Sequence, residues 1–454
     1  MMEKSLLKFT LLFFLSWIFL FSVSAQSRFP ENKIYQDLLN QAKEEDKPMF
    51  LVIHNNGDQF LPFKTPISQT SIDLIHKKFI TGEVELKRDD INHPLNKTFS
   101  LSSPIYLFTD KDGYPILRHN FPIKDDRALM QLIDSAHTIA QGETLGKLIA
   151  QYRKGIRNRL LLTKLLTQYQ GLDLYTDQQV LSDYFAQLTI QELNNFETVI
   201  FLLGSGPIYN SKNYLLTHTN DKMVDSLYAT LPAPQRKKIN NRIIQQTFRE
   251  ALNKKDISLA QNIGYFAYNT WESNYLRGES SRRFHPLEYT RLMRDSINYI
   301  SMAKNYYDNS FYQIDPDSMA RIDFVTSRHI KGSPLKTVLD SAEQAIFNQG
   351  ADKRRQYYKD EQARNLNYGS EQILNFGKKN IQALFDAIRW QQKAIAQHPG
   401  NGRYHHTLAQ LLYHVGFYAQ AEFEQQQAIH HHKSNKELYR QMQAVLKQMQ
   451  SRTL

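Results

Sequence analysis

The sequence predicts an α/β domain, with a central mixed sheet flanked by helices, followed by an all-α helical-repeat region. Up to about residue 141, short apolar runs typical of strands alternate with segments of helical spacing, and beyond it only the helical spacing continues. Near the C-terminus, alanines recur after a shift of 34 residues, which is typical of stacked helical hairpins. We therefore expect four parts: a signal peptide at residues 1–25, the α/β domain at 26–143, a helical region at 144–370 and repeats at 371–454.

The first 25 residues have the features of a cleavable export signal. Lys4 and Lys8 precede an apolar stretch at residues 10–21, and small residues (Val-Ser-Ala) at 23–25 predict cleavage after Ala25. The apolar stretch is shorter than the ~20 residues that a membrane span requires. A retained signal anchor is the alternative. We expect the mature protein to be periplasmic or secreted, without a transmembrane span.

The chain is basic and contains no cysteine. Its 56 Lys and Arg against 45 Asp and Glu give a formal net charge of +11, and the basic residues are dispersed along the sequence. This pattern indicates a solvated basic surface, with attraction to an anionic envelope surface as the alternative. Export argues against nucleic acid as a partner. Without cysteine, the fold is held by packing and not by disulfides.

Each element of the α/β domain has a local signal. The first helix ends before Pro48, because the residue that precedes a proline avoids the helical region. Ser68 or Thr70 can cap the second helix, and residues 110–113 (Asp-Lys-Asp-Gly) form the turn of a hairpin. The expected order is helix, strand, helix, strand, strand, strand, helix, at residues 34–46, 49–53, 68–78, 80–86, 105–108, 114–117 and 125–141.

This order and three short motifs resemble the thioredoxin superfamily, in particular the exported, helically extended proteins of Bacteroidota-type bacteria. The motifs are the Lys-Pro-apolar strand at residues 47–53, Ser103-Pro104 before a strand, and the turn at 110–113. The resemblance covers about residues 29–140. It implies that Pro104 is a cis-proline beside the active-site loop, where the family pairs with extended peptides. An ordinary trans-proline that opens an edge strand is the alternative.

The loop after the first strand departs from that family. Where the family carries Trp-Cys-x-x-Cys, residues 58–61 are Asp-Gln-Phe-Leu, so no thiolate is available for thiol–disulfide exchange. The loop still follows the end of a parallel strand, where ligands favour binding. A decayed redox loop with Asp58 as a helix cap is the favoured interpretation. The candidate ligand loop consists of His54, Asn55, Asn56, Asp58 and Pro104.

The middle of the chain predicts paired antiparallel helices. Leu, Ile, Tyr and Phe recur at three- and four-residue spacing, and turn sequences at residues 204–207 and 231–234 separate the runs. Residues 277–285 (RGESSRRFH) predict a loop. The expected helices lie at residues 160–169, 178–188, 190–203, 237–253, 257–268 and 334–347.

The C-terminal part resembles the tetratricopeptide repeat. Its 34-residue period places small residues where the two helices of a unit cross closely. The units are degenerate, because His405 and Lys433 stand where Trp and Pro are usual. Residues 435–450 fit a solvating cap, and earlier helices are expected to supply less recognisable units. The repeat-packing residues are Ala387, Ala394, Ala421 and Ala428.

Two further patterns have simpler explanations. The C-terminal histidines could bind a metal if several converged, but a solvated surface is the favoured interpretation, and no metal is expected. Five Asp-Ser pairs, at residues 134, 225, 295, 317 and 340, resemble the O-glycosylation acceptor motif of exported Bacteroidota proteins; helix caps are the alternative. The sequence contains no nucleotide, dinucleotide, zinc-protease or hydrolase motif, and no cofactor is expected.

Together these features predict an exported binding protein that is not an enzyme. Both parts of the expected fold offer surfaces for polypeptides, so the expected partner is a protein or peptide of the cell envelope. A scaffold and a holdase are both consistent with this prediction. The alternatives are a thiol–disulfide pathway accessory or enzyme that uses His54 and Asp58, and a purely structural domain.

Overall fold

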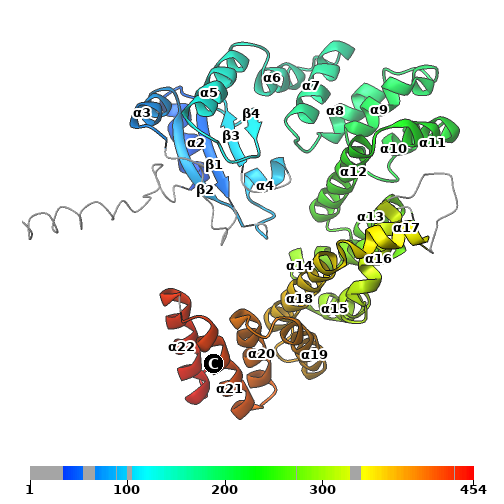
Figure 1. Cartoon of the computed structure of the whole chain (residues 1–454). Helices are drawn as coiled ribbons and strands as arrows, with labels where there is room; N and C mark the ends of the chain where they lie inside the picture. Colours follow the sequence, from blue (N-terminus) through cyan, green and yellow to red (C-terminus); the bar gives the residue numbers. More distant parts are fainter. Residues whose placement is uncertain are drawn as a thin grey trace, which may run out of the picture. The chain divides into compact units, whose positions relative to one another are not determined.

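The computed structural model describes residues 34–54, 67–87, 89–99, 105–271, 273–327, 339–433 and 435–454. The expected signal peptide lies outside these residues. The chain is mostly helical with one four-stranded mixed sheet, and it divides into two compact units, Met1–Gln187 and Leu188–Leu454 (Figure 1). No helix within the described residues has the length and apolar character that crossing a bilayer demands.

The first unit is built on a sheet with the strand order β2-β1-β3-β4. β1 pairs in parallel with β2 and antiparallel with β3, and β3 pairs antiparallel with β4. β1 is buried except at its last residue, as its continuous apolar sequence predicts for a central strand. The strands are β1 (Met49–His54), β2 (Ile80–Glu85), β3 (Ile105–Thr109) and β4 (Pro115–His119).

Helices cover the sheet of the first unit. Phe50, Tyr106 and Phe108 form a core with the apolar faces of α3 and α5. On α2, Leu38 packs against Gly82, where a Cβ atom would lie 2.3 Å from a Leu38 methyl carbon. The helices are α2 (Tyr35–Glu44), α3 (Gln69–Lys78), α4 (Pro94–Thr98), α5 (Asp126–Gln141), α6 (Leu145–Arg153), α7 (Arg159–Gly171) and α8 (Gln178–Phe185).

The second unit contains only helices within its described residues, and many of them pair as hairpins. The most extensive pairs are α13 with α14, α18 with α19, and α20 with α21 (Figure 1). The helices are α9 (Phe196–Gly204), α10 (Lys212–Thr217), α11 (Asp221–Thr230), α12 (Ala233–Lys254), α13 (Ile257–Thr270), α14 (Tyr275–Leu292), α15 (Ser296–Tyr307), α16 (Pro316–Ser327), α17 (Ser341–Asn348), α18 (Ala351–Phe376), α19 (Ile381–Gln397), α20 (Gly402–His414), α21 (Tyr418–His431) and α22 (Lys436–Gln450), with a 3-10 turn η1 (Glu192–Asn194) and a π-helical turn η2 (Asp308–Tyr312).

The loop predicted at residues 277–285 is wrong, because this segment lies inside α14. Asn274 caps the helix, since its side chain accepts a hydrogen bond from a backbone N–H of the first turn. Glu279 then forms ion pairs with Arg282 and Arg283, three and four residues further on. These interactions stabilise a helix whose Gly and Ser residues suggested a loop.

Two other expectations for the helices need correction. The single helix expected at residues 190–203 is divided into η1 and α9, because Asn195 leaves the helical conformation and caps α9 by accepting from the backbone N–H of Thr198 at 3.0 Å. The short helix α4 was not expected. His93 caps it, and Pro94 at its first position already has a helical φ.

The pH dependence of stability should reveal a histidine on α14. His285 lies beside the rings of Phe248 and Phe284, at 5.8 and 5.5 Å between ring centres. Burial lowers its pKa to about 4, because the charged form is poorly solvated there. Between pH 6.5 and 4 the unfolded chain therefore binds a proton that the native state does not. Lowering the pH from 7 to 5 should cost about 2 kcal/mol through this residue.

The measurement is urea unfolding at several pH values for the native sequence and for His285→Phe. The difference in unfolding free energy between the two proteins should shift in favour of His285→Phe as the pH falls from 6.5 towards 4. Parallel pH profiles would show that His285 does not titrate in this way.

Candidate functional site

The candidate loop of the first unit is described only at its start. His54 is the last residue of β1, and its Nε2 lies 2.8 Å from Oε1 of Glu83 on the adjacent strand β2. Both side chains are mostly buried. The sequence analysis did not identify Glu83, which reaches His54 only because β1 and β2 pair in parallel. The other residues of the candidate loop, which lie outside the described residues, are Asn55, Asn56, Asp58 and Pro104.

The four repeat-packing alanines lie in two equivalent helices, α19 and α21. Each of them has no exposed surface. The carbonyl of Ala387 accepts a hydrogen bond at 3.1 Å from the hydroxyl of Ser370 on the partner helix α18, which places the two backbones close together. Small residues at these positions therefore allow each helix pair to pack closely. The four residues are Ala387, Ala394, Ala421 and Ala428.

The structure adds a buried amide to each repeat. Gln391 and Gln425, again 34 residues apart, have no exposed surface. The side chain of Gln391 donates to the carbonyl of Tyr404 at 2.8 Å, and that of Gln425 donates to the carbonyl of Met442 at 2.8 Å. Each glutamine thus links its helix to the following one. The 34-residue period contained this signal, which the sequence analysis missed.

His405 is a packed histidine and not a surface residue. Its Nδ1 lies 2.6 Å from a carboxylate oxygen of Glu424, and its Nε2 lies 2.9 Å from the carbonyl of Pro399. Both ring nitrogens therefore face acceptors, and the hydrogen bond to Glu424 raises the pKa of His405. Across the described ranges, no group of three or more His, Asp or Glu residues has the arrangement of a metal site.

Three of the five Asp-Ser pairs lie at the start of a helix. Asp295 caps α15 by accepting from the backbone N–H of Asn298. Asp340 caps α17 in a reciprocal arrangement with Glu343. Asp317 lies in the first turn of α16, whereas the pairs at residues 134 and 225 lie within α5 and α11. The capping explanation accounts for the roles of Asp295 and Asp340.

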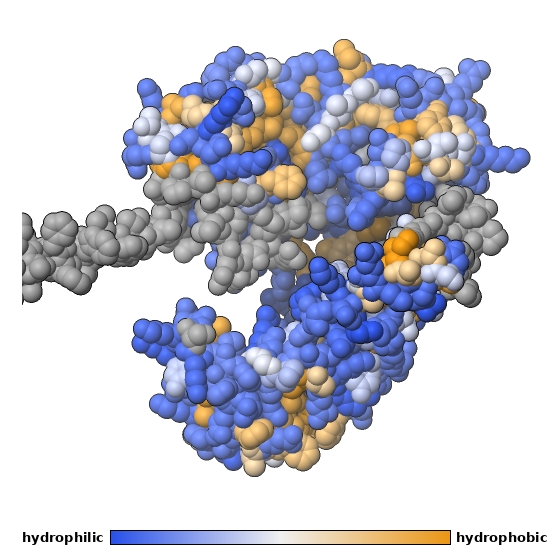
Figure 2. Space-filling model, in the orientation of Figure 1, coloured by the Kyte–Doolittle hydropathy of each residue, from blue (hydrophilic) through white to orange (hydrophobic). Residues whose placement is uncertain are grey.

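Four large apolar side chains gather at the turns of the C-terminal hairpins, and we call them the aromatic edge. They are between 40% and 62% exposed. Figure 2 shows orange and white side chains at the lower end of these helices. The rings of Phe385 on α19 and Phe417 before α21 lie 6.4 Å apart. Gly416, at φ +91°, makes the turn that carries Phe417. The aromatic edge consists of Ile381, Phe385, Phe417 and Tyr418.

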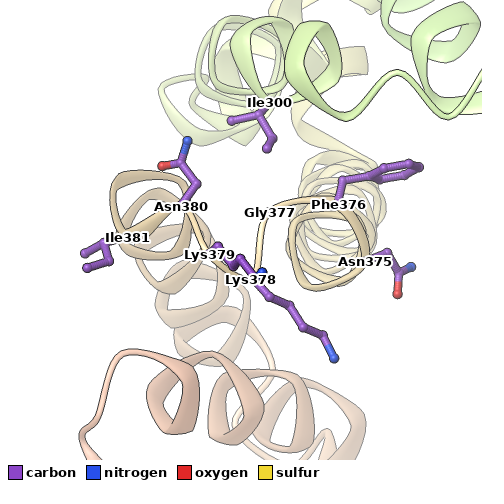
Figure 3. Close-up of a pocket in the computed structure, with 8 residues that line it drawn as sticks. All are labelled: Ile300, Asn375, Phe376, Gly377, Lys378, Lys379, Asn380 and Ile381. Atoms are coloured by element: carbon purple, nitrogen blue, oxygen red, sulfur yellow. The ribbon is translucent and has the colours of Figure 1, made fainter.

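A basic recess adjoins the aromatic edge. It has a volume of about 700 Å³ and lies at the turn between α18 and α19. Figure 3 shows Ile300, Phe376 and Ile381 around this turn, which carries Lys378 and Lys379. The pKa of the nearby His414 is lowered by burial and by the charge of Lys378. The surface next to the aromatic edge is therefore apolar and positively charged.

No protein-family model, no curated protein and no solved structure matches this chain. The geometry of the chain is therefore the basis for its function. In the described residues this geometry offers a His54–Glu83 pair at the end of a strand, and an exposed apolar surface on stacked hairpins.

Proposed function

We propose that this protein is an exported, non-enzymatic binding protein whose aromatic edge holds apolar segments of other polypeptides in the cell envelope, as a scaffold or holdase. One observation carries the proposal: four large apolar side chains remain exposed together on adjacent hairpins. Contiguous exposed apolar surface is costly in water and marks interaction sites. Aromatic side chains are enriched among residues that dominate binding energies.

We also propose that the first unit is a thioredoxin-like domain without redox function. The support is the order of its elements: a parallel pair, β1 and β2, separated along the chain by α3, then the antiparallel pair β3 and β4, then α5. The complete absence of cysteine excludes thiol chemistry from such a domain. In this proposal the first unit contributes a peptide-facing surface and not a reaction.

The ion pair between His54 and Glu83 favours a second candidate function. A histidine held by a carboxylate at the end of a parallel strand can act in proton transfer. In this alternative the protein is an enzyme or a thiol–disulfide pathway accessory that uses the loop after β1. The two candidates place the functional residues in different units, so matched variants can separate them.

The test is suppression of aggregation of the insulin B chain, released by a reductant that has no disulfide to attack in this protein. The double variant Phe385→Ser/Phe417→Ser should require about tenfold more protein for the same suppression, because two apolar contacts are lost. The control Ile297→Ser replaces a side chain that is 81% exposed on α15 and should behave like the native sequence. Thermal unfolding should be unchanged in both variants.

His54→Ala decides between the two candidates. Suppression of aggregation should survive this substitution if the aromatic edge is the binding surface. If suppression is lost in His54→Ala and retained in Phe385→Ser/Phe417→Ser, the binding function belongs to the first unit and the proposal is wrong.

A further inference from the structure

A second groove, separate from the aromatic edge, crosses α14 between α13 and α15. Its volume is about 490 Å³. The wall combines an exposed tyrosine ring, an apolar side chain, two amides and two guanidinium groups. The residues are Tyr265, Met302, Gln261, Asn305, Arg282 and Arg283.

A glycine brings the two sides of this groove together. A Cβ atom at Gly264 of α13 would lie 2.5 Å from the carbonyl oxygen of Arg282 on α14. Only glycine therefore allows the two backbones to approach so closely. The close approach places the guanidinium of Arg282 at 5.5 Å from the ring centre of Tyr265, within reach of a cation–π interaction.

The groove carries a surplus of positive charge. One carboxylate oxygen of Glu279 receives all three contacts: Nη2 of Arg282 at 2.8 Å, Nε of Arg282 at 3.2 Å and Nη2 of Arg283 at 2.9 Å. Among the described residues, no other carboxylate forms an ion pair with either arginine. Two guanidinium groups, each with five N–H donors, thus share one carboxylate.

We propose that this groove binds an extended acidic segment of a partner polypeptide. A carboxylate of the segment pairs with Arg282 and Arg283, because the guanidinium fork matches carboxylate geometry. The ring of Tyr265 packs against a neighbouring apolar side chain of the segment. The exposed amides of Gln261 and Asn305 match the donors and acceptors of an extended peptide backbone. Glu279 occupies the arginines in the free protein and competes with the ligand.

The experiment measures fluorescence anisotropy of a labelled peptide in which glutamate alternates with leucine, added to the full mature chain. The same peptide with glutamine in place of glutamate is the matched probe. The glutamate peptide should bind about tenfold more tightly than the glutamine peptide, and its advantage should shrink as salt is raised. Equal binding of the two peptides would overturn the proposal.

Three variants assign the binding to the groove. Arg282→Gln/Arg283→Gln should abolish the preference for glutamate. Glu279→Gln should tighten binding of the glutamate peptide several-fold, since the internal competitor is gone. Arg321→Gln removes one positive charge from an exposed position on α16 and should change nothing. If Glu279→Gln leaves affinity unchanged or weaker, the arginines only stabilise α14 and the proposal fails.

Further arms keep the result decisive. If Arg282→Gln/Arg283→Gln does not fold, Tyr265→Ala replaces it, because this substitution leaves no buried charge and should weaken binding of both peptides. Phe385→Ser/Phe417→Ser should keep the preference for glutamate, so failure here is separate from failure of the aromatic edge. Inorganic phosphate that displaces the peptide at equal concentration would reveal a simple anion site, which contradicts the proposal.

Discussion

Replacing Arg277 with methionine should destabilise the second unit by about 3 kcal/mol. Arg277 on α14 binds Glu361 on α18 through two hydrogen bonds, of 2.7 and 2.9 Å, and Asp323 on α16 at 3.1 Å. The three side chains are only 18%, 22% and 23% exposed. The variant leaves two carboxylates facing each other without their cation. Such uncompensated charge is among the most costly changes in a folded protein.

The pKa of Arg277 supports a strong interaction. Burial by itself would lower this pKa, but the hydrogen bonds and charges of Glu361 and Asp323 outweigh burial and raise it. Asp323 also accepts hydrogen bonds from Asn274, at 2.5 Å, and from Tyr358. The network therefore fixes three helices by directed contacts between residues distant in the sequence.

Arg355→Ala is the matched control. Arg355 on α18 also pairs with a residue of α16, Asp317, but both side chains are about half exposed. Exposed ion pairs contribute little in water, so this variant should unfold like the native sequence. Urea unfolding followed by helical circular dichroism measures both. Equal midpoints for Arg277→Met and Arg355→Ala would contradict the account.

Ala421→Leu should destabilise the C-terminal hairpins by about 1–3 kcal/mol, because the added carbons have no space. Ala421 is fully buried between α21 and its neighbours. Ala419 lies two residues earlier on the same helix and is exposed. Ala419→Leu is therefore the control with the same change in chemistry, and it should leave stability almost unchanged.

The loss in Ala421→Leu should spread along the stack, since each hairpin is stabilised by its neighbours. Limited proteolysis should show earlier cleavage in α20, α21 and α22, while α5 of the first unit stays protected. Faster cleavage of α5 to the same extent, or similar cleavage of Ala419→Leu, would show that the packing of Ala421 is not the cause.

The elements with local signals could be predicted from the sequence. The cap of α3 at Ser68 and the continuous apolar sequence of β1 are properties of a few adjacent residues. The segment at residues 277–285 could not be placed in the same way. Its helical state depends on ion pairs within α14 and on Gly278, which packs against Tyr268 of α13. Tertiary contacts here override the local preference of Gly and Ser for loops.

The candidate sites differ in the same respect. Small residues at a fixed period predict close packing, and the same period relates Asn401 to Asn435, which cap α20 and α22. By contrast, Arg277 and Glu361 are 84 residues apart in the sequence. Nothing in a single sequence pairs such residues. The aromatic edge is likewise visible only when the turns of two hairpins lie side by side.

Hydrogen–deuterium exchange of the full mature chain, with and without the insulin B chain, tests the central claim most directly. The account predicts that added client slows exchange at the first turns of α19 and α21 and at the turn that carries Phe417. It also predicts unchanged exchange at β1 and β2 of the first unit. Protection at the end of β1 around His54, with none at α19 or α21, would contradict the account.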